Sequence, residues 1–285
     1  MKLLAIGLSL FGLLESAHAS TTIDTVNKYS YAANLGWMDW RGDTNSGAVI
    51  GEYVCSGYVY AANVGWISLG SGAPTNGIYY QNLSASDCGV NHDGQGNLRG
   101  FAWGANIGWI NFENIGAPKV DLKTGRINGY IYSANCGWIG LSNSFAQVQT
   151  VTIASGLMDT NGLPIAWELQ NFSTQGVDPL ADPDHDGMSN KEEYLAGTNP
   201  NDTNDKLAIT SVSAITSGGG TLNVAWKSVP TREYYIQTKT NLASAWSDSG
   251  LGLIASDGAF TTRTLSDLAA TAGFYRVHVV KPLAP

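Results

Sequence analysis

Aromatic and small residues alternate along the first half of the chain, a pattern that indicates short β-strands. One eight-residue phrase, an aromatic residue followed by two small residues and then Asn-x-Gly-Trp-Ile/Met, begins at Tyr31, Tyr60, Trp103 and Tyr132. Its asparagines are 29, 43 and 29 residues apart, so we expect two paired units with an insertion between them. Residues 20–145 are therefore predicted to form an antiparallel β-repeat domain in which neighbouring units complete one core. A barrel, a propeller-like ring and an open stack all remain possible.

The strand that follows each Asn-x-Gly turn has two contrasting faces. One face is mostly aliphatic, with Met38 and Trp40 in the first copy. The other carries one tryptophan per copy: Trp37, Trp66, Trp109 and Trp138. These rings can pack against the next unit, which is the first expectation for a recurring aromatic residue. Alternatively, they form an open ligand face that stacks on sugar rings.

Residues 182–193 have the spacing of an oxygen-only Ca²⁺ loop. Acidic or amide side chains stand at loop positions one, three, five and nine, glycine stands at six and glutamate at twelve. This arrangement turns alternate side chains inward, allows a sharp bend and lets the last glutamate close the cage with two oxygens. The expected side-chain ligands are Asp182, Asp184, Asp186, Asn190 and Glu193.

A weaker copy of this loop precedes it. Asp159, Asn161 and Glu168 fall at positions three, five and twelve, but Leu157 at position one cannot bind a cation. The copy is therefore expected to be a weak site, or to lend its oxygens to a shared one. Short helices are predicted over residues 163–171 and after Ser189, where Ser189 and Glu192 have capping-box spacing.

The two loops resemble the thrombospondin type-three and dockerin-like calcium repeats of exported bacterial proteins. This resemblance covers the acidic segment, residues 157–205, and implies EF-hand-like Ca²⁺ binding in which the Met188 carbonyl joins the ligands named above. The aromatic phrase resembles a Trp/Tyr-x-x-Asn-x-Gly-Trp-Ile repeat of uncharacterised exported bacterial proteins, which implies a location but no activity.

The C-terminal module, residues 206–285, reads as five short strands separated by Gly, Ser, Pro and Asn turns. At this length a small β-sandwich is expected. The resemblance to fibronectin type III-like modules of exported bacterial proteins rests on Val224-Ala225-Trp226, the segment Tyr235 to Leu242, Trp246 and the final Phe274-Tyr275-Arg276-Val277. The resemblance implies a spacer, a display module or a binding accessory. The whole chain is thus predicted to be mainly β.

The net charge and the first residues limit the expected partners and the expected location of the protein. The net charge is −8, and the acidic segment holds ten acidic residues and one lysine, which points to a cation site. The chain has no basic run, so nucleic acid is not an expected partner. Residues 1–19 have the pattern of a signal peptide, and no later apolar run is long enough to span a membrane. Secretion, or a place at the cell surface or in the periplasm, is expected.

Three cysteines, Cys55, Cys88 and Cys136, leave at least one thiol unpaired within the chain. A Cys55–Cys88 bridge is one possible pairing, whereas Cys55 and Cys136 replace apolar residues of other copies and can be small buried side chains.

The sequence favours a non-catalytic protein that binds polysaccharide or cell-envelope components, adheres to them or is displayed on a surface. No nucleophile motif or zinc-protease motif occurs. One alternative is a purely structural envelope protein. The other is a polysaccharide hydrolase, whose two carboxylates need not be close in the chain. The candidate catalytic carboxylates of such a hydrolase in the repeat domain are Asp39, Glu52, Asp87, Asp93, Glu113 and Asp121.

Overall fold

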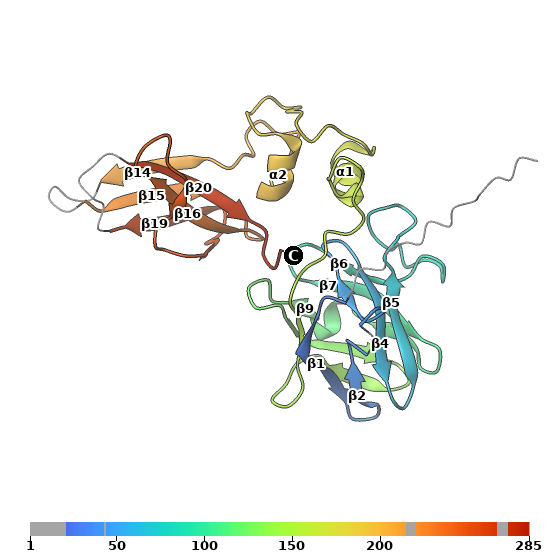
Figure 1. Cartoon of the computed structure of the whole chain (residues 1–285). Helices are drawn as coiled ribbons and strands as arrows, with labels where there is room; N and C mark the ends of the chain where they lie inside the picture. The colour runs from blue at the N-terminus through green and yellow to red at the C-terminus, as the bar shows by residue number, and fades with distance from the viewer. Residues whose placement is uncertain (1–20, 43, 215–219, 267–272, 285) are drawn as a thin grey trace, which may run out of the picture.

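The computed structural model describes residues 21–42, 44–214, 220–266 and 273–284, and the predicted signal peptide lies outside them. The fold is mainly β, as predicted, with antiparallel sheets and two short α-helices (Figure 1). No helix in the described ranges is long and apolar enough to cross a membrane.

The four aromatic phrases form four hairpins that close into one barrel (Figure 1). Neighbouring hairpins pair edge to edge, and the last strand returns to the first through Tyr31 and Gly140. Closure removes the exposed edges that an open stack of hairpins would leave. The barrel strands are β1 (Ile23–Ala32), β2 (Gly36–Asp39), β4 (Cys55–Ala61), β5 (Gly65–Ser71), β7 (Leu98–Gly104), β8 (Gly108–Asn111), β11 (Tyr130–Ser133) and β12 (Gly137–Gly140).

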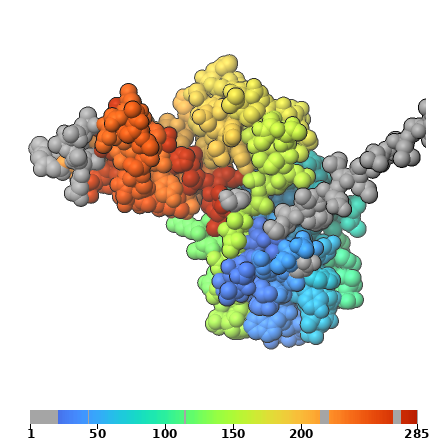
Figure 2. All heavy atoms as spheres, viewed as in Figure 1, coloured from blue at the N-terminus to red at the C-terminus, as the bar shows by residue number. Residues whose placement is uncertain are grey.

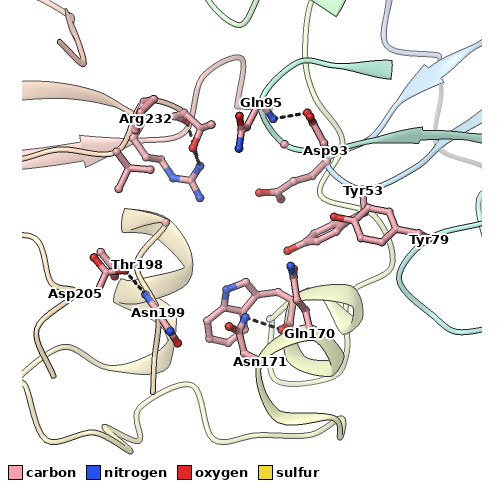
Figure 3. Close-up of a pocket in the computed structure, with 17 residues that line it drawn as sticks. Tyr53, Tyr79, Asp93, Gln95, Gln170, Asn171, Thr198, Asn199, Asp205 and Arg232 are labelled. Atoms are coloured by element: carbon pink, nitrogen blue, oxygen red, sulfur yellow. Dashed lines mark hydrogen bonds between the residues drawn. The ribbon is translucent and has the colours of Figure 1, made fainter. Parts of the chain in front are cut away.

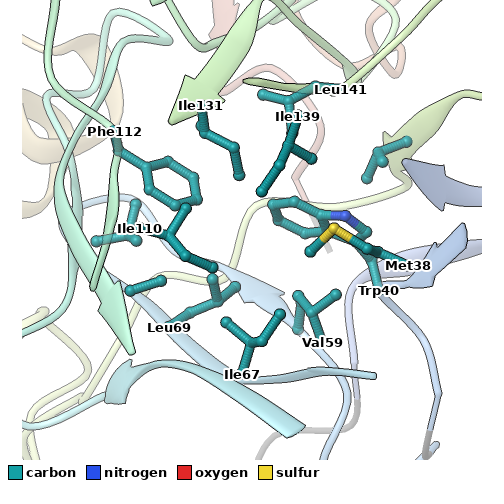
Figure 4. Close-up of a cluster of buried hydrophobic side chains, with 14 of the residues drawn as sticks. Met38, Trp40, Val59, Ile67, Leu69, Ile110, Phe112, Ile131, Ile139 and Leu141 are labelled. Atoms are coloured by element: carbon teal, nitrogen blue, oxygen red, sulfur yellow. The ribbon is translucent and has the colours of Figure 1, made fainter. Parts of the chain in front are cut away.

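The barrel interior is filled by the aliphatic face of the repeat (Figure 4). Every predicted inward residue of the four copies is at most 1% exposed. The largest, Trp40, donates its indole N–H to the Ser30 hydroxyl at 2.9 Å, so its polar atom is satisfied within the core. The inward residues are Met38, Trp40, Ile67, Leu69, Ile110, Phe112, Ile139 and Leu141.

The repeated asparagines join the hairpins in a ring of hydrogen bonds. Each side-chain amide donates to the backbone carbonyl of the residue before the turn glycine in the preceding hairpin, and the first donates to the last. The glycine two residues after each of these asparagines takes a positive φ of 71–80°, which an L side chain rarely adopts. The bonds, of 3.0–3.1 Å, run from Asn34 to Cys136, Asn63 to Leu35, Asn106 to Val64 and Asn135 to Ile107.

Shorter strands extend the barrel at one end. They are β3 (Val49–Ile50), which pairs with β4, β6 (Val90–His92), which pairs with β7, and the series β13 (Val148–Thr150), β10 (Arg126–Asn128) and β9 (Lys119–Val120), which continues from β1. All three cysteines are free, so the possible Cys55–Cys88 bridge is absent. Cys55 and Cys136 are buried core side chains, and burial raises the pKa of the Cys55 thiol to about 12.

The acidic segment contains helices α1 (Ile165–Phe172) and α2 (Asn190–Ala196), packed around Leu163, Trp167 and Tyr194. The predicted capping box at α2 is present, and Gly197 ends that helix with a φ of 76°. Helix α1 starts two residues later than predicted, because Pro164 is its extended N-cap and not part of its first turn.

The C-terminal module is sandwich-like (Figure 1). One sheet contains β14 (Ile209–Ala214), β15 (Leu222–Lys227) and β19 (Phe260–Leu265). The other contains β16 (Glu233–Lys239), β17 (Ser247–Asp248), β18 (Ile254–Ala255) and β20 (Phe274–Val280). Trp226 from the first sheet and Tyr234 from the second meet edge to face, with ring centroids 5.7 Å apart, in their common core.

Candidate functional site

The second acidic loop gathers three carboxylates at one point. Ligand oxygens of Asp182, Asp184 and Asp186 lie within 4.8 Å of one another. The backbone N–H groups of Asp186 and Gly187 donate to the Asp182 carboxylate at 3.2 and 3.0 Å, and these bonds hold the loop in a tight turn. Gly187 has a φ of 97°, which accounts for glycine at position six. The loop therefore brings three like charges together, and the one lysine that contacts it, Lys206, donates to the Asp186 backbone carbonyl at 2.8 Å.

Helix α2 closes the same loop with Asn190 and Glu193. Glu193 is fully buried, and neither of its carboxylate oxygens accepts a hydrogen bond of regular geometry, although the Thr198 hydroxyl lies near enough to lower its pKa. Asn190 donates its amide to the Asp178 carbonyl at 2.8 Å, and its side-chain oxygen is buried without a partner. Buried polar atoms without partners are costly, and each is expected to have a ligand. These oxygens fit a hard cation such as Ca²⁺, which takes six to eight oxygen ligands.

The electrostatics of Glu193 agree with this interpretation. Burial, with the nearby charges of Asp184 and Asp186, raises the pKa of Glu193 to about 7. A bound divalent cation would reverse this balance, because it stabilises the ionised carboxylates that otherwise repel one another. Met188, whose carbonyl was predicted to be a ligand, stands between Asp186 and helix α2 and donates its backbone N–H to the Asp186 carboxylate at 2.8 Å.

The first loop has fewer free oxygens. One Asp159 oxygen accepts from the backbone of Asn161 at 3.0 Å, and the Asn161 amide donates to the Val177 carbonyl at 2.5 Å. Glu168 is fully buried and accepts from the Val177 backbone at 2.9 Å. One oxygen each of Asp159 and Glu168 remains buried without a donor. Leu157, at position one, is 58% exposed, so this loop offers a cation only part of a cage.

Helix α2 also connects the acidic segment to both β modules, through residues that the sequence did not single out. The hydroxyl of Tyr194, the residue after Glu193, donates to the Glu52 carboxylate at 2.9 Å. Lys281 forms an ion pair with the same carboxylate at 2.6 Å and also contacts the Tyr194 hydroxyl. We call Glu52, Tyr194 and Lys281 the joint. Figure 2 shows the acidic segment resting against the barrel and the C-terminal module.

The four repeated tryptophans lie on the outside of the barrel and pack mainly within their own hairpins, although Trp37 also packs on Phe145, which follows the fourth hairpin. They are 44–49% exposed. Each packs on two aromatic rings of its hairpin partner strand, mostly edge to face, with centroids 4.6–6.3 Å apart. We call these twelve rings the aromatic belt: Tyr29, Tyr31, Trp37, Tyr58, Tyr60, Trp66, Phe101, Trp103, Trp109, Tyr130, Tyr132 and Trp138.

The carboxylates considered for hydrolysis are each bonded within the barrel or across the joint. Asp39 pairs with Lys28 at 2.7 Å, and Glu52 belongs to the joint. The others accept hydrogen bonds from nearby backbone groups: Asp87 from Thr75, Asp93 from Gln95, Glu113 from Gly100 and Asp121 from Lys123. Among these candidates, Glu52 and Asp93 line a common cavity.

Comparison with known proteins adds no family to these observations. No protein-family model matches the chain, and neither a curated protein nor a solved structure is significantly similar to it.

Proposed function

We propose that the chain is a non-catalytic, exported Ca²⁺-binding protein. The observation that carries the proposal is Glu193, a fully buried carboxylate whose oxygens accept no hydrogen bond of regular geometry and which lies against Asp184 and Asp186. An unpaired buried charge is strongly unfavourable, and a cation bound by oxygens is the simplest partner for this one. Asp182, Asp184, Asp186, Asn190, Glu193 and the Met188 carbonyl would hold the ion.

The test is calorimetric titration of the full mature chain with Ca²⁺. We expect one site with a dissociation constant of about 10⁻⁴–10⁻³ M, ordinary for an extracellular module. Asp184→Ala removes a ligand and should abolish the heat of Ca²⁺ binding. Asp202→Ala, which removes an exposed acid of the same segment outside the loop, is the matched control and should bind normally. Equal titration curves for the two variants would refute the assignment.

We further propose that the aromatic belt binds polysaccharide of the cell envelope. Half-exposed indole and phenol rings supply the flat apolar platforms on which sugar rings stack, and they recur around the barrel in four similar clusters. Polar side chains stand beside them. Asp39 is opposite Tyr60, Ser68 is opposite Trp103 and Asn111 is opposite Tyr132 in neighbouring strands. A repeated weak contact of this kind gains avidity on a repetitive polymer.

Binding to insoluble and soluble polysaccharides can be measured by co-sedimentation and affinity electrophoresis. The double variant Trp66→Ala/Trp109→Ala should lose retention, whereas Phe260→Ala, which removes an exposed ring of the C-terminal module, should not. If no polysaccharide retains the unmodified chain, the belt proposal fails and a structural envelope role is the better account.

A further inference from the structure

A cavity of about 520 Å³ lies where the barrel, the acidic segment and the C-terminal module meet (Figure 3). Glu52, Tyr53, Tyr79, Asp93 and Gln95 line it from the barrel side. Trp167, Gln170, Asn171 and Thr198 line it from the acidic segment, and Arg232 from the C-terminal module. This volume is within the range of small-molecule sites, which often form between domains.

One wall of the cavity is aromatic. The rings of Tyr53 and Tyr79 lie against each other, with centroids 5.8 Å apart and a tilt of 51°. Trp167 is 6% exposed and packs edge to face on Tyr194 of the joint, so it is held in place. The wall offers apolar ring faces on a rigid support, and its phenol hydroxyls add polar atoms at the edge.

Other parts of the lining carry amides. The side chains of Gln95 and Gln170 have no hydrogen-bond partner among the residues that the structure describes, and both are exposed at the cavity. Asn171 donates its amide to the Trp167 carbonyl at 2.9 Å, which leaves its side-chain oxygen as an acceptor. Amides both donate and accept hydrogen bonds, so these groups suit a ligand with many hydroxyl groups.

The charged groups of the lining are three carboxylates, Glu52, Asp93 and Asp205, and one cation, Arg232. Glu52 is neutralised by Lys281 at 2.6 Å. The Arg232 guanidinium donates to the carbonyls of Leu195 and Tyr194 at 2.7 and 3.0 Å, where it caps helix α2, and Asp93 and Asp205 lie on other parts of the lining. A phosphate would need a cluster of cations, and an amine would need free carboxylates gathered on one wall. Neither arrangement is present in this lining.

We propose that this cavity binds the end of a neutral saccharide, with a sugar ring against Tyr53 and Tyr79 and its hydroxyl groups bonded to Gln95, Gln170 and Asn171. The site is separate from the aromatic belt on the barrel. Because residues of all three modules line it, the bound sugar also ties them together. Its lining contains no proposed Ca²⁺ ligand and no residue of the aromatic belt, and the sugar titration is made with Ca²⁺ present, so its failure and theirs can be observed separately.

The experiment is calorimetric titration of the full mature chain, in Ca²⁺, with a panel of neutral mono- and disaccharides of glucose, galactose, mannose and N-acetylglucosamine. Gln170→Arg places a long charged side chain into the cavity from the exposed face of α1 and should weaken binding about ten-fold or more. Gln175→Arg makes the same change at an exposed position outside the lining and should have no effect.

Tyr79→Ala removes part of the aromatic wall and should also weaken binding, while Trp66→Ala/Trp109→Ala should leave it unchanged. Unfolding curves of each variant identify any that fail to fold. Binding of none of the panel sugars, equal affinities for Gln170→Arg and Gln175→Arg, or loss of binding with the belt variant would overturn the proposal.

Discussion

The barrel and the acidic segment reach a stable fold by different means. The barrel buries a continuous apolar cluster of twenty-five residues, whereas the acidic segment has a cluster of three. Of the buried side-chain polar atoms without partners in the described residues, none belongs to the barrel and most belong to the acidic segment. The barrel is therefore complete without a ligand. The acidic segment has the features of a structure that an ion completes, because its few apolar contacts must offset several buried carboxylates.

This difference also suggests why the two regions are bonded together at Glu52, Tyr194 and Lys281. Tyr194 follows the buried Glu193 in helix α2, so whatever orders that helix also positions the hydroxyl that meets the barrel. The joint thus links the ion-dependent part of the molecule to the part that needs no ion.

The largest expected loss of folding stability comes from a substitution that creates a cavity in the barrel core. Ile110→Ala removes a side chain that is 1% exposed and should lower the free energy of unfolding by about 2–5 kcal/mol, equally in Ca²⁺ and in chelator. Ile115→Ala, at a position 84% exposed, is the matched control and should be nearly neutral. Urea unfolding followed by circular dichroism gives both values. A loss that depends strongly on Ca²⁺ would show that the barrel is not self-sufficient.

Removal of Ca²⁺ should come next in size. At 100-fold excess over its dissociation constant the ion should stabilise the acidic segment by about 2.7 kcal/mol. In chelator we therefore expect proteases to cut within residues 157–205 first and to release a resistant barrel fragment. In Ca²⁺ the same sites should be protected, but not in Asp184→Ala. Identical cleavage patterns with and without the ion would contradict the inference that the acidic segment, unlike the barrel, needs the ion.

The dependence of folding stability on pH in the ion-free protein should be a smaller effect, and it should come from Glu193. The folded-state pKa of Glu193 is raised to about 7 from 4.5, so the fold binds this proton more tightly than the unfolded chain does. Stability in chelator should fall as the pH rises from 4.5 through 7. In Glu193→Gln that part of the pH dependence should vanish. With Ca²⁺ the sign reverses, because protons compete with the ion, and affinity should weaken toward acid pH.

The smallest effect should come from the asparagine ring. Asn63→Ala removes the 3.0 Å bond to the Leu35 carbonyl and should cost about 0.5–1.5 kcal/mol, near the lower value because the turn is exposed. Asn128→Ala, whose side chain makes only a local 3.4 Å bond to Arg126, serves as the comparison. If both substitutions lower the unfolding temperature equally, the ring of asparagine hydrogen bonds does not contribute to closure of the barrel.

The sequence by itself determined the local structure of this protein. The period-two pattern determined the hairpins and the aliphatic inner face, and Asn-x-Gly determined turns whose glycines take positive φ. The spacing of residues 182–193 placed Asp182, Asp184 and Asp186 together, and the Ser189–Glu192 box marked the start of α2. These features depend on residues close in the chain, where propensity and hydrogen bonding act directly.

Only the tertiary structure decided which face of the repeat is outside. Both faces carry large apolar side chains, because the face with Asp39, Ser68 and Asn111 also carries the tryptophans, and the recurring tryptophan suggested packing. An eight-stranded barrel has an interior just wide enough for side chains to fill, and it takes the aliphatic residues with Trp40 and Phe112 while Trp37 and its three counterparts remain outside. The joint likewise brings Glu52 together with Tyr194 and Lys281, which follow it in the chain by 142 and 229 positions. No local pattern records such a contact, because it exists only once three modules have packed.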